Sequence, residues 1–222
     1  SPDGSLLYVG LRSETILLLD AKTGERRGVR DIKGPAVAVN PVDGSLIVGG
    51  GNGVTAWQLG SDPAGDVLLS STDDWYPEKI LVSTGGEYGL GYGGDGDGAN
   101  IFFDPSTLEE TGRLPQEITK VWDAQPLDGG KWLLVLGVDE QERNTLFLVE
   151  SSSRVAEVSV PLGAESRADF QDLAVGADAQ EIYVSGSRSI ARIDLAETRT
   201  PFPWYWIVSG VLVLFAILTL VV

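Results

Sequence analysis

Residues 1–10 of the chain read Ser-Pro-Asp-Gly-Ser-Leu-Leu-Tyr-Val-Gly, and residues 40–50 read Asn-Pro-Val-Asp-Gly-Ser-Leu-Ile-Val-Gly-Gly. In both stretches a turn containing Pro, Asp and Gly leads into a short apolar strand. Weaker copies of the same pattern begin near Ser83, Gln125 and Gly176. A turn-and-strand unit that returns roughly every 40–50 residues indicates a repeat architecture in which each unit is one small β-sheet.

Apolar runs of strand length, separated by Gly, Pro and Asp turns, continue through all five units, and no helical periodicity appears before the C-terminal end. The pattern predicts an all-β fold, a β-propeller domain over residues 1–196 with at least five four-stranded blades. The first unit lacks an inner strand and the last lacks an outer strand, so part of the propeller is expected to precede Ser1. The predicted strands are 6–9, 15–20 and one near Val29; 36–39, 46–48 and 54–59; 80–82, 88–92 and 100–104; 121–124, 132–136 and 145–149; and 173–175, 182–184 and 190–195.

Residues 202–222 form an apolar run without a charged side chain, and its first turn is rich in Trp and Tyr. About 20 such residues allow a helix to cross a ~30 Å hydrocarbon core, and aromatic side chains collect at membrane interfaces. We therefore expect a single transmembrane helix at 202–222, after a linker at 197–201. Arg192 and Arg199 favour a cytoplasmic propeller, whereas a cleaved signal peptide would place it on the other side of the membrane.

The composition narrows the classes of function. The formal net charge is −16, and no charged residue follows Arg199, so the imbalance belongs to the propeller. An acidic surface repels phosphates and argues against nucleic-acid partners. The chain has no Cys, His or Met, so it lacks thiolate and imidazole groups as nucleophile, general base or metal ligand. We expect no catalytic, cofactor-binding or metal-binding residues and no enzymatic activity.

One local stretch, the glycine insertion at 93–98, has side chains suited to a ligand. Asp95, Asp97 and Asn100 offer the oxygen donors that Ca²⁺ prefers. The remaining ligands of an EF-hand loop are out of register, and the alternative is a mobile hairpin loop. No Lys-Ser or Lys-Thr pair follows the glycines, which excludes a P-loop. Glycines at 49–53 are interpreted as a hairpin turn.

Two further groups of side chains have a functional and a structural interpretation. The adjacent carboxylates in each of two pairs would point to opposite faces of a strand, so solvated loop charges fit them better than glycosidase chemistry. Four tryptophans spread over three repeats could form a stacking surface, but packing between blades is the simpler interpretation. The pairs are Asp73-Asp74 and Glu109-Glu110, and the tryptophans are Trp57, Trp75, Trp122 and Trp132.

The first 44 residues resemble the YVTN-type and WD-repeat β-propellers. The similarity is carried by Ser-Pro-Asp-Gly at 1–4, Leu-Leu-Asp-Ala-Lys-Thr-Gly-Glu at 18–25 and Gly-Pro-Ala-Val-Ala-Val-Asn-Pro-Val-Asp-Gly at 34–44, and it continues more loosely to residue 195. The chain departs from the pattern in its glycine insertion and in lacking Gly-His. Its Trp122-Asp123 pair lies in the wrong part of the repeat. The resemblance implies a binding platform and leaves the activity open.

A rigid platform, one predicted anchor and the lack of a catalytic set favour an accessory or scaffolding subunit of a membrane protein complex. Respiratory, photosynthetic and transport assemblies all fit, with other membrane subunits and the lipid bilayer as partners. One alternative is a membrane-anchored enzyme that uses carboxylates or a bound cation at the propeller axis. It requires two or more Asp or Glu side chains that converge there. Another alternative is a trafficking or exchange factor anchored by its C-terminal helix.

Overall fold

The computed structural model describes residues 1–11, 15–51, 53–93, 100–162, 170–176, 181–186 and 190–194. These residues form five antiparallel sheets, each built from strands that are consecutive in the chain. Two short 3₁₀ turns, η1 (Pro63–Gly65) and η2 (Asp128–Gly130), complete the elements. The strands are β1 (Leu6–Leu11), β2 (Thr15–Asp20) and β3 (Arg26–Arg30); β4 (Ala36–Val39), β5 (Leu46–Gly50), β6 (Gly53–Gln58) and β7 (Val67–Thr72); β8 (Lys79–Val82), β9 (Gly89–Tyr92), β10 (Ile101–Phe103) and β11 (Glu110–Arg113); β12 (Ile118–Leu127), β13 (Trp132–Asp139), β14 (Asn144–Glu150) and β15 (Val155–Pro161); and β16 (Phe170–Val175), β17 (Glu181–Gly186) and β18 (Ile190–Asp194).

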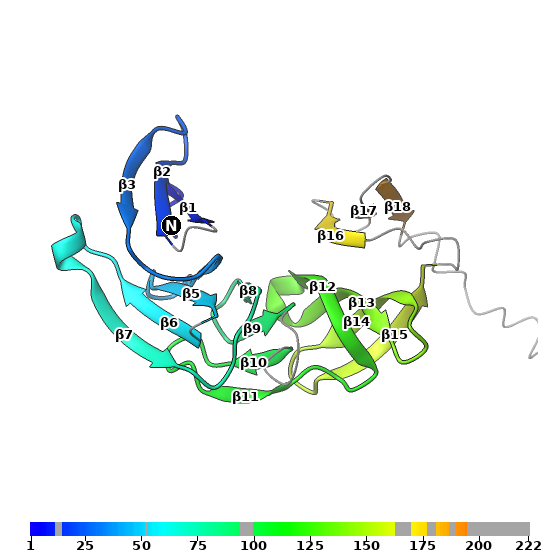
Figure 1. The fold of residues 1–222 in the computed structure, drawn as a ribbon. Helices are drawn as coiled ribbons and strands as arrows, with labels where there is room; N and C mark the ends of the chain where they lie inside the picture. Colours follow the sequence, from blue (N-terminus) through cyan, green and yellow to red (C-terminus); the bar gives the residue numbers. More distant parts are fainter. Residues whose placement is uncertain are drawn as a thin grey trace, which may run out of the picture.

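The five sheets are the blades of a β-propeller and are numbered 1 to 5 in chain order. Figure 1 shows them side by side along an arc, with the outer strands β3, β7, β11 and β15 on its convex side. Blades 2, 3 and 4 have four strands each, as predicted. In the part of the chain that the structure describes, blades 1 and 5 have three strands. Blade 1 begins at the strand equivalent to β5 of blade 2.

The repeated phrase forms the same turn in the first two blades. The Asp3 carboxylate accepts a hydrogen bond from the Ser5 backbone N–H at 3.1 Å, and the Asp43 carboxylate accepts one from the Ser45 N–H at 2.8 Å. The glycine between each pair has a positive φ, +69° at Gly4 and +75° at Gly44. A side-chain acceptor and a residue that tolerates the left-handed region are what this tight turn requires. The predicted turn at Gly44 is therefore confirmed.

Apolar side chains from facing blades form the core, which lies between the sheets. Ile16 and Leu18 of blade 1 pack against Leu46 and Val48 of blade 2. Larger clusters follow between blades 2 and 3, around Trp75 and Phe103, between blades 3 and 4, and between blades 4 and 5. Each sheet is thus covered on both faces wherever it has two neighbours, which explains the nearly continuous apolar runs in the sequence.

The structure corrects the predicted turn at 49–53. Gly49 and Gly50 belong to β5, and Gly50 pairs with Gly53, the first residue of β6. Both strands therefore extend into the stretch that was expected to form the turn. Gly53 has a φ of +93°, and a Cβ there would clash with the carbonyl oxygen of Thr72 on the neighbouring strand. Close approach of the two backbones explains the glycine at this position.

Several predicted features lie outside the described residues. These are the linker at 197–201, the transmembrane helix at 202–222, and Asp95 and Asp97 of the glycine insertion. Within the described ranges, no helix has the length and hydropathy needed to cross a membrane.

Candidate functional site

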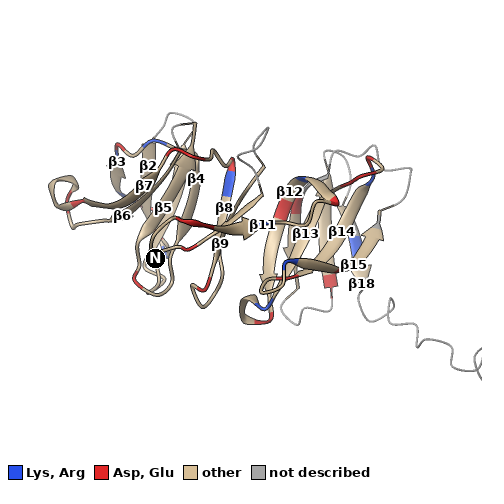
Figure 2. Ribbon diagram, turned by 90° about the horizontal axis from the view of Figure 1, so that it is seen from below, with Lys and Arg blue, Asp and Glu red and all other residues tan. Residues whose placement is uncertain are grey.

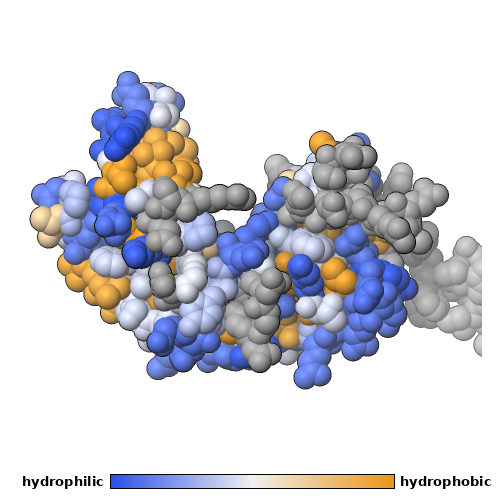
Figure 3. Space-filling model, viewed as in Figure 1, coloured by the Kyte–Doolittle hydropathy of each residue, from blue (hydrophilic) through white to orange (hydrophobic). Residues whose placement is uncertain are grey.

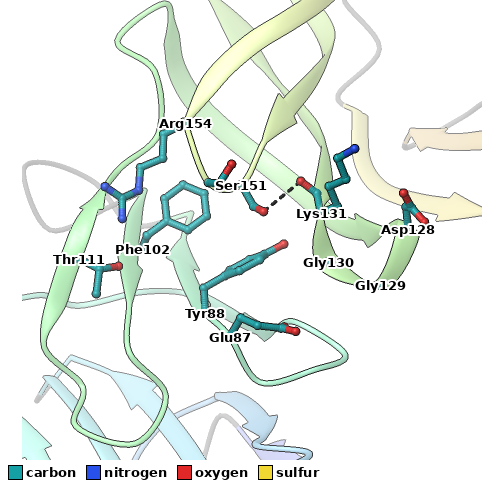
Figure 4. Close-up of a pocket in the computed structure, with 11 residues that line it drawn as sticks. Glu87, Tyr88, Phe102, Thr111, Asp128, Gly129, Gly130, Lys131, Ser151 and Arg154 are labelled. Carbon is teal, nitrogen blue, oxygen red and sulfur yellow. Dashed lines mark hydrogen bonds between the residues drawn. The ribbon is translucent and has the colours of Figure 1, made fainter.

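A pocket of about 510 Å³ opens between blades 3 and 4. Its walls come from the β8–β9 turn, β10, β11, the β12–β13 turn with η2, and the turn that joins β14 to β15 (Figure 4). The volume falls within the range of about 300–1,000 Å³ that is common for small-molecule sites. The lining residues are Glu87, Tyr88, Phe102, Thr111, Asp128, Gly129, Gly130, Lys131, Ser151, Ser152 and Arg154.

Tight turns of blade 4 hold one wall of the pocket in place. Asp128, Gly129 and Gly130 all have positive φ values, and a Cβ at Gly130 would lie 2.9 Å from the Ser83 side chain of blade 3. The Lys131 carbonyl accepts two hydrogen bonds from Ser151, from its backbone N–H at 3.0 Å and its hydroxyl at 2.9 Å. The two turns of blade 4 that face blade 3 are therefore tied together.

Tyr88 lies across the pocket with its hydroxyl unsatisfied. The residue is 9% exposed, and its ring meets the Phe102 ring edge-on at a centroid distance of 5.4 Å. Its hydroxyl has no hydrogen-bond partner among the described residues. Burial, together with the nearby charge of Glu87, raises the pKa of Tyr88 to about 12, so the hydroxyl stays protonated. Figure 4 shows the ring directed toward Ser151.

Arg154 forms the opposite wall. Its backbone has a φ of +57°, and its N–H donates to the Glu150 carbonyl at 2.8 Å, which fixes the turn. The guanidinium lies over the Phe102 ring, 5.5 Å from the centroid, and extends toward Thr111 in Figure 4. A Cβ at Gly112 would collide with the guanidinium, so the glycine makes room for it. The buried Nε of Arg154 has no partner among the described groups.

A second polar cluster joins the inner strands of blades 3, 4 and 5. Asp123 on β12 accepts hydrogen bonds from the Tyr92 hydroxyl at 2.8 Å and from the Leu173 N–H at 2.9 Å. The Lys79 ammonium lies 3.5 Å from a carboxylate oxygen of Asp123 and 3.5 Å from one of Asp172. Burial and the Asp123 charge raise the pKa of Tyr92 well above its ordinary value. The basic segment of β8 and the acidic segment of β12 are coloured in Figure 2.

The enzyme alternative requires Asp or Glu side chains that converge near the propeller axis, and this cluster is where carboxylates from two blades approach each other. Two carboxylates do converge, but on a lysine ammonium rather than on an open site. Asp123 also makes two further hydrogen bonds within the protein. Across the described ranges, no group of three or more Asp and Glu residues could hold a metal ion. The geometry is that of a link between blades.

The other candidate residues from the sequence are placed as follows. Asp73, Asp74, Glu109 and Glu110 are exposed, in agreement with solvated charges. Trp75 is buried against Phe103 with ring centroids 5.0 Å apart, and Trp57 and Trp122 pack at the edges of the clusters between blades. Trp132 lies beneath the Lys131 ammonium at 5.5 Å. Of the proposed calcium ligands, Asn100 alone is described, and it has a φ of +66°.

No protein-family model matches the chain, and no curated protein sequence matches it. Solved structures do resemble it. One is hydrazine synthase from Kuenenia stuttgartiensis, with a TM-score of 0.62 and 16% identity over 88% of this chain. Another is the β-propeller domain of Cps50 (Swd1) from Myceliophteria thermophila, with a TM-score of 0.65 and 13% identity over 87% of this chain. The chain spans 64% and 62% of the length of these two structures. At such identities the likeness establishes the fold alone, a β-propeller.

Proposed function

We propose that the chain is a non-catalytic scaffold that binds another protein through the outer strand of blade 2. In the finer form of this proposal, it is an accessory subunit of a membrane protein assembly, anchored by residues 202–222. The uncharged apolar sequence of that segment supports the anchor. The observation that carries the binding role is the run of exposed apolar side chains on β7.

β7 is an edge strand with unusual side chains for its position. Val67, Leu68 and Leu69 are consecutive and are 54%, 47% and 50% exposed. Their strand pairs with β6 on one side only, so its outer backbone groups face away from the sheet. Natural edge strands usually carry charges or proline, which discourage pairing with other chains. An apolar edge without these features favours a protein contact, either by side-chain burial or by addition of a strand.

The outer strands of the other blades differ from β7. The outer strand of blade 1 reads Arg-Arg-Gly-Val-Arg, and that of blade 3 reads Glu-Thr-Gly-Arg, so both edges are charged. The outer strand of blade 4, β15, exposes Val155, Val158 and Val160 by 51%, 49% and 39%, but it also carries Glu157 and ends at Pro161. Figure 3 shows hydrophobic surface along the convex edge of blade 2. Since these four outer strands share one architecture, the uncharged apolar edge of β7 is a property of its sequence and not a requirement of the fold.

The test uses the full chain, extracted from its native membrane in mild detergent. We expect at least one protein to co-purify in stoichiometric amount. Replacing Leu68→Glu together with Leu69→Glu should reduce that recovery strongly, because a charge would be buried at the contact. Val42→Glu is the matched control, since Val42 is an isolated apolar side chain that is 72% exposed in the β4–β5 turn. Undiminished recovery with the double variant would overturn the proposed role of β7.

A further inference from the structure

We propose that the pocket between blades 3 and 4 binds a small monocarboxylate with an apolar body, and that the Arg154 guanidinium is the anchor for its charge. The site is distinct from β7, and ligand binding there does not depend on a protein partner. Three observations carry the proposal: a fixed and unpaired guanidinium, a buried hydroxyl without a partner, and an aromatic wall between them.

The guanidinium is held in place before any ligand arrives. The backbone of Arg154 lies in a turn closed by the hydrogen bond to the Glu150 carbonyl, and the guanidinium carbon lies 5.5 Å from the centroid of the Phe102 ring. The missing Cβ of Gly112 leaves the space that the guanidinium occupies. A side chain ordered in this way loses little conformational entropy on binding, which favours affinity. Such a fork of donors matches the two oxygens of a carboxylate.

The lack of a carboxylate partner for Arg154 is informative in this chain. Asp and Glu number 32 against 16 Lys and Arg, so acceptors are plentiful. Five of the six other described arginines have an acidic partner within ion-pair distance: Arg27, Arg30, Arg113, Arg143 and Arg192. The sixth, Arg26, forms no ion pair among the described residues, but it is exposed to solvent. No ion pair involves Arg154 among the residues that the structure describes, although its Nε is buried. An unpaired buried donor costs free energy, so an external anion is the natural complement.

The other lining groups define the ligand further. Glu87 and Asp128 lie on the rim, and their charges would repel a dianion such as phosphate more than a monoanion. The edge-on rings of Tyr88 and Phe102 offer an apolar surface. The buried Tyr88 hydroxyl has no partner among the described residues, and a polar atom of the ligand beyond that surface would supply one. The expected ligand therefore has a carboxylate at one end for Arg154, an aryl or aliphatic body for the aromatic wall, and a polar group at the other end for the Tyr88 hydroxyl.

The probe we would use is para-hydroxyphenylacetate, titrated calorimetrically into the full chain in mild detergent. Arg154→Gln should weaken binding by roughly tenfold or more, because a hydrogen bond to a charged group is lost. Tyr88→Phe should weaken it by a smaller factor while leaving the melting temperature unchanged or higher. Arg113→Gln, which removes the same charge from the neighbouring strand outside the pocket, is the matched control and should bind like the wild type.

Two further ligands test whether the site selects a singly charged carboxylate. The neutral para-hydroxyphenylacetamide and inorganic phosphate should both bind at least about tenfold more weakly than the carboxylate. Arg154→Lys, which keeps the charge without the planar fork, should fall between wild type and Arg154→Gln. Absence of carboxylate binding to the wild type, equal binding of the amide, or equal loss in Arg154→Gln and Arg113→Gln would each overturn the proposal. Since these titrations need no partner protein, their failure is separable from failure of the β7 contact.

Discussion

Asp123 is the residue whose removal should most disturb the assembly of the blades. Its carboxylate on β12 of blade 4 accepts hydrogen bonds from Tyr92 of blade 3 and from the Leu173 N–H of blade 5, with the Lys79 ammonium 3.5 Å away. The residue is 8% exposed, and Tyr92 and Leu173 are each 4% exposed. Asp123→Ala would therefore leave two buried donors without an acceptor.

The expected cost follows from these contacts. Each buried donor left unsatisfied costs about 1–3 kcal/mol, and removal of the buried carboxylate returns part of this by ending its own desolvation. The net loss in the free energy of unfolding should be about 3 kcal/mol. Tyr92→Phe removes only the hydroxyl and leaves Asp123 its contacts with Leu173 and Lys79, so it should cost about 1 kcal/mol.

Urea denaturation of the full chain in mild detergent measures both values. With a slope of about 2 kcal/mol per molar urea, Asp123→Ala should lower the midpoint by roughly 1.5 M. The double variant Asp123→Ala/Tyr92→Phe should cost less than the sum of the single changes, by about 1 kcal/mol, because the two groups interact directly. Asp172→Ala is the control, since Asp172 meets the same lysine from an exposed position and should cost less than about 1 kcal/mol.

Two results would refute this reasoning. One is a loss below about 1 kcal/mol for Asp123→Ala, which would mean that its hydrogen bonds contribute little net stability. The other is an equal effect of Asp172→Ala, which would assign the stabilisation to the lysine and not to the buried acceptor.

Three further predictions concern turns, acid stability and metals. Gly44→Val should lower the free energy of unfolding by about 1 kcal/mol or more and reduce the melting temperature, because Gly44 has a φ of +75°; an unchanged melting temperature would contradict this. Burial pushes the pKa of Asp139 up, but hydrogen bonds from the side chain and backbone of Arg143 and from the Gln141 N–H outweigh it and hold that pKa below its ordinary value. The stabilising contribution of the Asp139 carboxylate is therefore complete above about pH 4 and lost as the pH falls through its folded-state pKa, so the difference between wild type and Asp139→Asn in urea should shrink at low pH; a difference that grows on acidification would be the wrong sign. Elemental analysis of the purified chain should show no stoichiometric zinc or copper, since the sequence has no Cys or His; a full equivalent of either metal would count against the expectation.

The inner strands of the blades could be predicted from the sequence because each is an apolar run bounded by Gly, Pro or Asp turns. β4 occupies 36–39 as predicted, where Gly34-Pro35 precedes it and the Asp43-Gly44 turn follows. The outer strands β7, β11 and β15 were not placed individually. They face solvent, so their side chains lack the alternation that marks a half-buried strand. β12 runs to Leu127, beyond the predicted end at 124; Pro126 is compatible because β12 is an edge strand.

The polar sites could not be predicted in the same way because they depend on contacts between blades. Arg154 follows three serines in the turn between β14 and β15, and nothing local marks its position over Phe102 and Gly112, which are about 40 or more residues earlier. Asp123 was noticed only as part of a misplaced Trp-Asp pair. Its role becomes visible when Tyr92 and Leu173 converge on it from neighbouring blades. A signal that would have helped is the scarcity of basic residues, which makes each unpaired arginine noteworthy.

The most direct test of the scaffold proposal is hydrogen–deuterium exchange of the full chain, measured in its native assembly and after release from it. We expect the backbone amides of β7 to become protected in the assembly, while those of the charged edge strands β3 and β11 exchange at the same rate in both states. Partner binding at β7 would bury the apolar side chains that this strand exposes in the isolated chain. Unchanged exchange at β7, with protection elsewhere on the propeller, would contradict the central claim.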